Sequence, residues 1–134
     1  METVLFVCVH NAGRSVMAEA IFNRFVGGRE RARAVSAGTE PAAAPHPEVV
    51  QAMREIGLDV SGHTGRLLTD DMVRQATRVI TMGCVVDERA CPAIRYAGVE
   101  DWVLEDPRGQ PVERVRQIRD EIERRVRLLA DDLG

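Results

Sequence analysis

Short apolar runs alternate with segments of helical spacing along this chain, and the alternation limits how it can fold. Four runs predict strands, over residues 3–8, 33–37, 78–82 and 101–104. Strands that alternate with helices are typical of βαβ units, which build a parallel sheet. We therefore expect a three-layer α/β domain, with a four-stranded parallel sheet flanked by helices.

Three stretches have apolar residues three or four positions apart, the spacing of a helix with one buried face. The first is Met17, Ala20, Ile21 and Phe25, and the second is Val49, Val50, Met53 and Ile56, which stops at Gly57. The clearest is Val112, Val115, Ile118, Ile122, Val126 and Leu129. A loop is expected over residues 41–47, with His46-Pro47 opening the second helix.

Composition narrows the class of protein. The chain has 134 residues, 45% of them hydrophobic, which suits one domain over residues 1–134. A net charge of −3 offers no basic field for nucleic acid, and no apolar stretch approaches the length of a membrane span. Three cysteines without a secretion signal favour reduced thiols over a disulfide framework. We expect a cytoplasmic monomer that binds neither nucleic acid nor membrane.

The first predicted strand runs into a loop suited to binding an oxyanion. A strand that ends at Cys8 and a helix that begins near Ser15 leave a loop whose N–H groups can curl inward, and the helix terminus adds partial positive charge. The expected substrate-binding set is Cys8, Val9, His10, Asn11, Ala12, Gly13, Arg14 and Ser15. The alternative is a buried strand cysteine followed by an ordinary turn.

Individual residue types in this loop fit nucleophilic chemistry. Gly13 can adopt a positive φ, and Arg14 can hold two oxygens with its planar guanidinium. Ser15 can either cap the helix or donate a hydrogen bond to the Cys8 thiolate. Amide dipoles and an arginine favour the thiolate form, so Cys8 is expected to be a nucleophile beside a bound oxyanion. The role of His10 is left open.

These residues give the chain a full-length resemblance. The segments that carry it are the loop of residues 8–15, Ser36-Ala37-Gly38-Thr39, Ile80-Thr81-Met82 ahead of Cys84, and Asp106-Pro107. The chain resembles the low-molecular-weight protein tyrosine phosphatase superfamily and, within it, the arsenate reductases of the same flavodoxin-like fold. The resemblance implies that Cys8 is the nucleophile, Arg14 the oxyanion clamp, Ser15 the thiolate donor and Asp106 the general acid.

Two further cysteines separate reductase from phosphatase. If the first and third strands are neighbours, Cys8 and Cys84 leave the same sheet edge, and strands about 4.8 Å apart lie within disulfide reach. The resemblance to thiol-relay reductases implies a Cys8-Cys84 disulfide and then a Cys84-Cys91 disulfide that an external thiol reduces. Because a helix would separate Cys84 and Cys91 by about 10 Å, the segment between them must be a loop or unwind. The alternative is that both are incidental thiols.

The predicted function is therefore reduction of arsenate to arsenite, giving arsenic detoxification. Thioredoxin fits a three-cysteine relay as electron donor, and a low-molecular-weight thiol such as mycothiol is the alternative. The second candidate is a phosphatase that hydrolyses phosphomonoesters through a Cys8 phosphoenzyme, and the third is a non-catalytic phosphoprotein-binding module. Arg108-Gly109-Gln110 follows Asp106-Pro107, where tyrosine phosphatases of this class usually carry aromatic residues, which argues against a phosphotyrosine pocket.

No bound cofactor or resident metal is expected. The cysteines and histidines lack the spacing of a zinc site. Some reductases of the superfamily hold a potassium ion, and Asn11, Glu19 and Ser36 match its ligands. Arg66, after His63-Thr64, stands where an acidic ligand is expected, so a potassium site at Asn11, Glu19 and Ser36 is left open as the weaker alternative.

Overall fold

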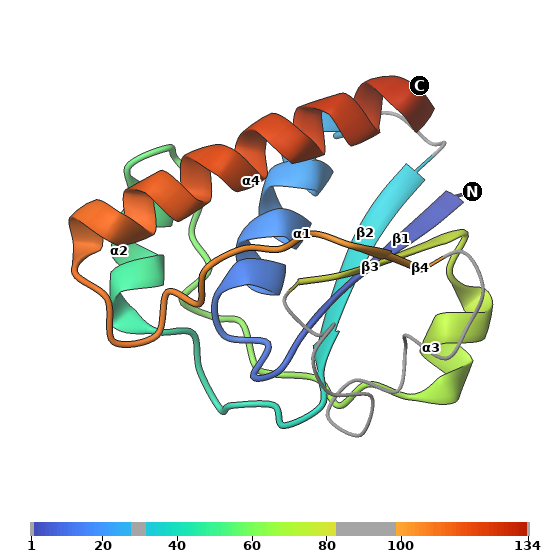
Figure 1. Cartoon of the computed structure of the whole chain (residues 1–134), viewed down its shortest axis with the longest axis horizontal. Helices are drawn as coiled ribbons and strands as arrows, with labels where there is room; N and C mark the ends of the chain where they lie inside the picture. The colour runs from blue at the N-terminus through green and yellow to red at the C-terminus, as the bar shows by residue number, and fades with distance from the viewer. Residues whose placement is uncertain (1, 28–31, 83–98, 134) are drawn as a thin grey trace.

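A four-stranded parallel sheet forms the middle layer of the molecule (Figure 1). This computed structural model describes residues 2–27, 32–82 and 99–133. The strands are β1 (Glu2–Cys8), β2 (Ala32–Gly38), β3 (Arg78–Thr81) and β4 (Val99–Asp101). They lie in the order β2-β1-β3-β4, and all three pairings are parallel. The predicted adjacency of the first and third strands is therefore confirmed.

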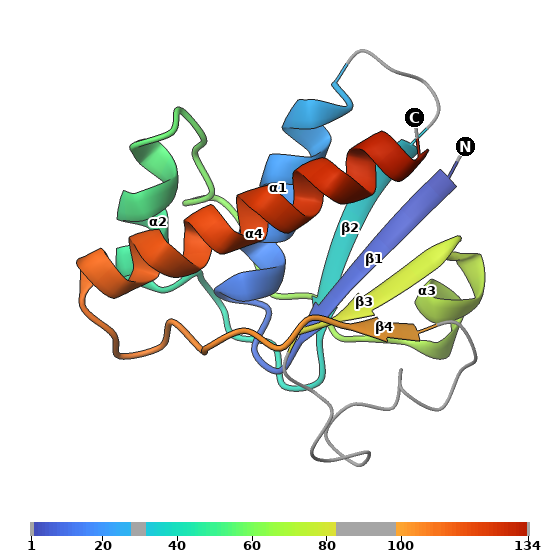
Figure 2. The ribbon, with the colours of Figure 1, turned by 45° about the horizontal axis from the view of Figure 1, so that its top comes forward.

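Helices cover both faces of this sheet (Figure 2). The helices α1 (Arg14–Phe25), α2 (Pro47–Arg54) and α4 (Val112–Leu133) lie on one face, and α3 (Asp70–Gln75) lies on the other. Alternate side chains of β1 point to opposite faces of the sheet. Val4 and Phe6 lie in the larger core. Leu5 and Val7 lie in the smaller core, together with Val73 of α3. The three-layer flavodoxin-like prediction is confirmed.

Most predicted elements lie within two residues of their expected bounds, but the last strand was placed wrongly. The sequence predicted residues 101–104, whereas β4 ends at Asp101. The Trp102 N–H still bonds the Thr81 carbonyl at 2.8 Å, but farther on the Leu104 carbonyl accepts from Arg14 instead of a strand. The helix α3 was not predicted. Its signal is Thr69, whose hydroxyl caps the helix by accepting from the Met72 N–H.

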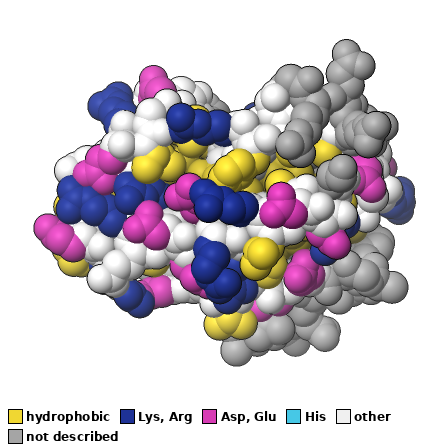
Figure 3. Space-filling model, turned by 90° about the horizontal axis from the view of Figure 1, so that it is seen from above, with side chains coloured by type: hydrophobic (Ala, Val, Ile, Leu, Met, Phe, Trp, Pro, Cys, Tyr) yellow, Lys and Arg dark blue, Asp and Glu magenta, His cyan; other side chains and the backbone are white. Residues whose placement is uncertain are grey.

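The long helix α4 buries its apolar stripe in the larger core, where it packs against α1 and α2. Ile118, Ile122 and Val126 are buried, as the sequence predicted. Arg119, also buried, donates to the Ala52 carbonyl at 2.8 Å and to Glu55 at 2.9 Å, which ties α4 to the end of α2. Seen from the α4 side, arginine and acidic side chains are interspersed over the surface (Figure 3).

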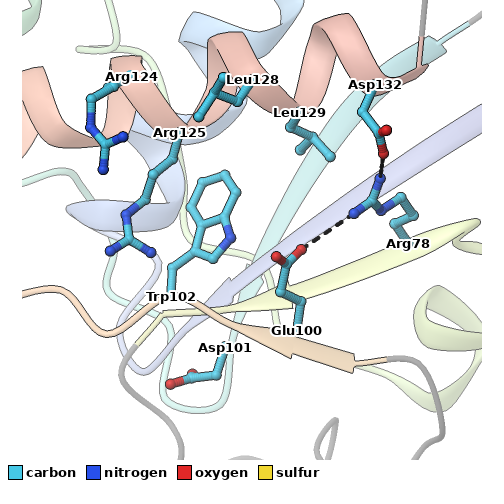
Figure 4. Close-up of a pocket in the computed structure, with 9 residues that line it drawn as sticks. All are labelled: Arg78, Glu100, Asp101, Trp102, Arg124, Arg125, Leu128, Leu129 and Asp132. Atoms are coloured by element: carbon cyan, nitrogen blue, oxygen red, sulfur yellow. Dashed lines mark hydrogen bonds and ion pairs between the residues drawn. The ribbon is translucent and has the colours of Figure 1, made fainter.

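The C-terminal part of α4 also reaches the edge of the sheet (Figure 4). Arg78 of β3 pairs with Asp132 of α4 at 2.8 Å and with Glu100 of β4 at 3.4 Å. Beside them, Trp102 packs its ring 5.7 Å from that of Phe6. These contacts hold the chain that leaves β4 and leads to Asp106. Within the described ranges, none of the helices is long and apolar enough to span a bilayer.

Candidate active site

The nucleophile candidate Cys8 is the last residue of β1, and Ser15 lies in the first turn of α1. Both side chains are buried, with 3% of Cys8 and none of Ser15 exposed, and the Cys8 Sγ lies 2.8 Å from the Ser15 Oγ. Ser15 makes no cap hydrogen bond with the helix. The sequence left open whether Ser15 caps the helix or bonds to Cys8, and the geometry favours the hydrogen bond with the Cys8 sulfur.

The tight turn of the loop falls on Asn11, which has a φ of 47°. Asparagine is one of the few residues with a side chain that adopts this left-handed conformation readily. The prediction that Gly13 supplies the positive φ was wrong, because its φ is −140°. Gly13 is needed for another reason: a Cβ there would lie 2.7 Å from the Pro107 Cγ, so the missing side chain lets the Asp106-Pro107 segment approach the loop.

A second segment fixes the orientation of the loop peptides. The carbonyls of Val9, His10 and Ala12 accept hydrogen bonds of 2.8–3.1 Å from the N–H groups of residues 40, 42 and 46, respectively. Among the residues that the structure describes, the N–H groups of residues 10–13 donate to no protein acceptor. With its carbonyls bonded and these N–H groups unused at the positive end of α1, the loop has the donors that an oxyanion requires.

Asn11 links the loop to residues that follow α2. Its Oδ1 accepts from the His63 Nε2 and from the Arg66 N–H, both at 3.0 Å. Its Nδ2 therefore faces Ser15 and donates to the Oγ at 2.8 Å. Because the Ser15 oxygen already accepts this bond, its own proton is available for the Cys8 sulfur. Burial is the main reason that the pKa of His63 is lowered from 6.5, and the nearby Glu19 opposes this shift.

Arg14 connects the loop to the segment after β4. Its side chain is buried, and its Nη1 donates to the Leu104 carbonyl at 3.0 Å. Its Nη2 lies 3.9 Å from the Asp106 carboxylate, which is about half exposed. A carboxyl group at the open side of an anion site, beside a fixed guanidinium, can donate a proton to a leaving oxygen.

Basic side chains line the rim of the site. The Arg108 N–H donates to the Asp106 Oδ1 at 3.0 Å, and its Nη1 lies 3.3 Å from the His10 Nε2. Since arginine is only a donor, the His10 Nε2 accepts, and its Nδ1 donates to the Glu40 carbonyl at 3.1 Å. His46 is a neighbour of this group that the sequence indicated only as a loop residue. Burial lowers its pKa from 6.5 more than the nearby Asp106 raises it.

The other two cysteines, Cys84 and Cys91, lie outside the described residues. The structure does fix the point at which the chain leaves β3, because the Met82 N–H donates to the Val7 carbonyl at 2.8 Å. Val7 immediately precedes Cys8. In the sequence, Cys84 follows Met82 by two residues.

The residues that the resemblance implied for potassium do not fit a cation. Both lone pairs of the Asn11 Oδ1 are taken by protein donors. The Glu19 carboxylate pairs with the Arg66 Nη1 at 2.9 Å, and its other oxygen lies 3.8 Å from the His63 Nδ1. Ser36 is fully buried, and its hydroxyl has no hydrogen-bond partner among the described residues. Glu19, the acidic residue of the set, is thus already paired with the guanidinium group of Arg66.

Taken together, the described residues place the Cys8 thiol beside a loop that can bind an anion. Ser15 faces the sulfur, free N–H groups and Arg14 can hold an oxyanion, and Asp106 can move a proton. This arrangement suits attack of a thiolate on the central atom of a tetrahedral oxyanion. Phosphoryl or arsenyl transfer to sulfur is the chemistry that both sequence-based hypotheses share.

Comparisons with known proteins define the class. The family model described as "Low molecular weight phosphotyrosine protein phosphatase" matches residues 3–134. The chain belongs to this family.

Within the family, a putative arsenate reductase of Halobacterium salinarum is 43% identical over 96% of this chain and 91% of its own length. An arsenate reductase solved in its phosphate-binding state superposes with a TM-score of 0.85 at 33% identity, with all of both chains covered.

Two other solved structures mark the range of activities in the family. A low-molecular-weight protein tyrosine phosphatase from T. tengcongensis gives a TM-score of 0.88 at 28% identity, covering 99% of this chain and all of its own. The Corynebacterium glutamicum thioredoxin-dependent arsenate reductase gives 0.78 at 36% identity, covering 99% of this chain and 62% of its own. The fold is thus common to reductases and phosphatases, and the identities are higher on the reductase side.

Proposed function

We propose that this protein reduces arsenate to arsenite by a cysteine relay. The observation that carries the proposal is the parallel pairing of β1 with β3, which starts the chain toward Cys84 beside the strand that ends at Cys8. The arsenate reductases among its relatives support the same reaction. Because the chain also carries Cys91, it has the three thiols that a relay needs.

In the first step, the Cys8 thiolate attacks arsenic while Arg14 and the loop N–H groups hold the oxygens. One arsenate oxygen leaves as water, and Asp106 supplies a proton to it. The product is a Cys8-arsenic bond in which arsenic is still pentavalent. Ser15, whose Oγ lies 2.8 Å from the sulfur, can donate a hydrogen bond to the attacking thiolate.

In the second step, the Cys84 thiolate attacks the Cys8 sulfur. The electron pair of the sulfur-arsenic bond passes to arsenic, which leaves as trivalent arsenite, and a Cys8-Cys84 disulfide forms. Cys91 then attacks Cys84 and releases the Cys8 thiolate. The resulting Cys84-Cys91 disulfide holds the oxidation until an external dithiol reduces it.

The proposed electron donor is thioredoxin, and the proposed location is the cytoplasm, where thiols are kept reduced. The name of the C. glutamicum relative supports a thioredoxin-type donor. A low-molecular-weight thiol would need only one exchange step and would leave Cys91 without a task. We propose that the protein works as a monomer, because one chain supplies the thiol of Cys8, the guanidinium of Arg14 and the carboxyl group of Asp106.

A phosphatase is the second candidate, because a tyrosine phosphatase shares the fold. The rim speaks against a phosphotyrosine ring, since Arg108 turns back onto Asp106 and His10 where an aromatic side chain would be needed. Slow phosphomonoester hydrolysis is expected as a side activity, because phosphate and arsenate have the same shape and charge.

The proposal is tested by following arsenate-dependent turnover with thioredoxin, thioredoxin reductase and NADPH, next to release of phosphate from a phenyl phosphate ester. Cys84→Ser and Cys91→Ser are expected to abolish steady-state arsenate reduction while phosphate release survives, whereas Cys8→Ser abolishes both. If Cys84→Ser reduced arsenate at the wild-type rate, the relay would be wrong. Full turnover of Cys91→Ser with thioredoxin would exclude thioredoxin as the partner of the last disulfide.

A further inference from the structure

The contacts of Arg66 differ from those of an ordinary surface arginine. Its side chain is about half exposed, yet its three polar parts contact three different elements. The Nη1 pairs with Glu19 of α1 at 2.9 Å, the N–H donates to the Asn11 Oδ1 at 3.0 Å, and the carbonyl accepts from the Gly38 N–H at the end of β2 at 2.8 Å. One residue thus joins α1, the nucleophile loop and the sheet.

The positive charge of Arg66 stands where a monovalent cation would have to bind. A cation beside Glu19 and Asn11 needs free oxygen lone pairs, but the Asn11 Oδ1 accepts two hydrogen bonds and the Glu19 Oε1 is paired with the guanidinium. A second positive charge at contact distance from Arg66 would also be repelled. The Asn11 Oδ1 and the negative charge of Glu19 are therefore already satisfied by protein groups.

The consequence reaches the nucleophile through a short series of hydrogen bonds. Arg66 and His63 hold the oxygen side of the Asn11 amide, which turns the Nδ2 toward Ser15. Ser15 in turn lies 2.8 Å from the Cys8 sulfur. If the segment that carries Arg66 moved away from α1, the amide of Asn11 would lose a partner and the loop would lose a support at its turn.

We infer that the Arg66 guanidinium replaces a bound monovalent cation in this protein: by pairing with Glu19, it seats the backbone that orients Asn11, so the anion site forms without potassium. Arg66 is a positioning residue, because it acts through Asn11 and does not touch the reacting atoms. The inference concerns the shape of the loop and holds for either a reductase or a phosphatase.

The test compares potassium with sodium at equal ionic strength, using inorganic phosphate as the probe of the loop. Two quantities are measured on the full chain: the thermal unfolding midpoint, and the dissociation constant of phosphate by calorimetry. The wild type and Arg66→Lys, which keeps the charge, are expected to give the same values in both salts. Arg66→Asp supplies a carboxylate beside Glu19 in place of the cation. In sodium, this variant should bind phosphate at least roughly fivefold more weakly than the wild type does, and potassium should restore much of the affinity.

The matched control is Arg74→Asp. Arg74 is an exposed arginine whose ion pair with Asp71 lies within α3. With the same change in charge at this position, the unfolding midpoint and the dissociation constant of phosphate should be the same in potassium as in sodium. If Arg66→Asp is too unstable to measure, Arg66→Gln takes its place. This variant removes the charge that pairs with Glu19 and should bind phosphate more weakly than the wild type in sodium. A wild-type protein that gains stability or phosphate affinity in potassium over sodium would overturn the inference, and so would wild-type phosphate affinity of Arg66→Asp in sodium.

Discussion

Hydrogen bonds orient the polar side chains around Cys8, and each donor and acceptor among them is defined by its partners. Asn11 takes the left-handed turn of the loop, and its side chain accepts on the oxygen side and donates on the nitrogen side. This leaves the Ser15 proton for the Cys8 sulfur. The sequence pointed to Ser15 as either cap or thiolate donor, and only the long-range contacts with His63 and Arg66 decide between them.

Ser15→Ala removes that donor. Hydrogen bonds to charged groups contribute about 1.5–3 kcal/mol, so the variant should turn over arsenate at least roughly tenfold more slowly than the wild type. The measurement is the rate of arsenate-dependent turnover, with the Cys8→Ser protein as the blank. Ser36→Ala is the matched control, because this serine is equally buried but its hydroxyl has no partner among the residues that the structure describes. An equal loss of turnover in both variants would contradict the role of Ser15.

Two histidines near the site make stability depend on pH. Burial lowers the pKa values of both His46 and His63 below 6.5, so the unfolded chain takes up protons at a higher pH than the folded one does. Their contribution to stability is complete above about pH 6.5 and is lost as the pH falls through the lowered values.

The urea midpoint should therefore decrease as the pH falls from about 7 to 5.5. Replacing both His46 and His63 by glutamine should flatten this slope, whatever the variant does to stability at pH 7. An unchanged slope would show that other groups cause the decrease. Glu121 is no such group, since hydrogen bonds from Arg124 and Arg125 lower its pKa to about 2 and its contribution persists above the usual carboxyl range.

At the level of elements, the site lies where β1, α1 and the segment after β4 meet. The strand and helix that flank the loop were predictable, because an apolar run and an amphipathic stripe end on either side of residues 9–13. The position of the last strand was not predictable. After β4, the Leu104 carbonyl accepts a hydrogen bond from the Arg14 side chain instead of pairing in the sheet. A contact between residues 90 positions apart leaves no local pattern in the sequence.

Gly13→Ala tests the contact between two of these elements. A Cβ at this position would lie 2.7 Å from the Pro107 Cγ, so Asp106-Pro107 must shift away from the loop. Displacements of about 1 Å at a reacting centre can cost up to roughly 100-fold in rate, and we expect turnover to fall by about ten- to 100-fold. Gly62→Ala is the control, because no atom of the described residues lies within 4 Å of its added Cβ. Turnover near the wild-type value in Gly13→Ala would show that the two segments need not touch.

At the level of the whole molecule, the sheet order places the chemistry. The alternating pattern of the sequence predicted a parallel sheet, and the pairing of β1 with both β2 and β3 puts the end of β1 in the centre of one edge. The loop of residues 8–15 follows directly from this topology and could be predicted. The segment of residues 40–46, which bonds the loop carbonyls, could not, because only the tertiary fold brings it there.

The same topology brings β3 beside the nucleophile, and the proposed relay depends on that neighbourhood. Val7, which precedes Cys8, pairs with Thr81, the last residue of β3. A phosphatase would need only the loop, Arg14 and Asp106. The relay needs in addition that a second thiol, two residues beyond Met82, can bond with the first.

The most direct measurement is therefore mass spectrometry of Cys91→Ser after one equivalent of arsenate, with free thiols alkylated and disulfide-linked peptides mapped. Without Cys91 the relay stops at its first disulfide, and the account predicts a Cys8-Cys84 linkage with one equivalent of arsenite released. A protein whose Cys8 and Cys84 are both recovered as alkylated thiols, with the arsenate unreduced, would contradict it.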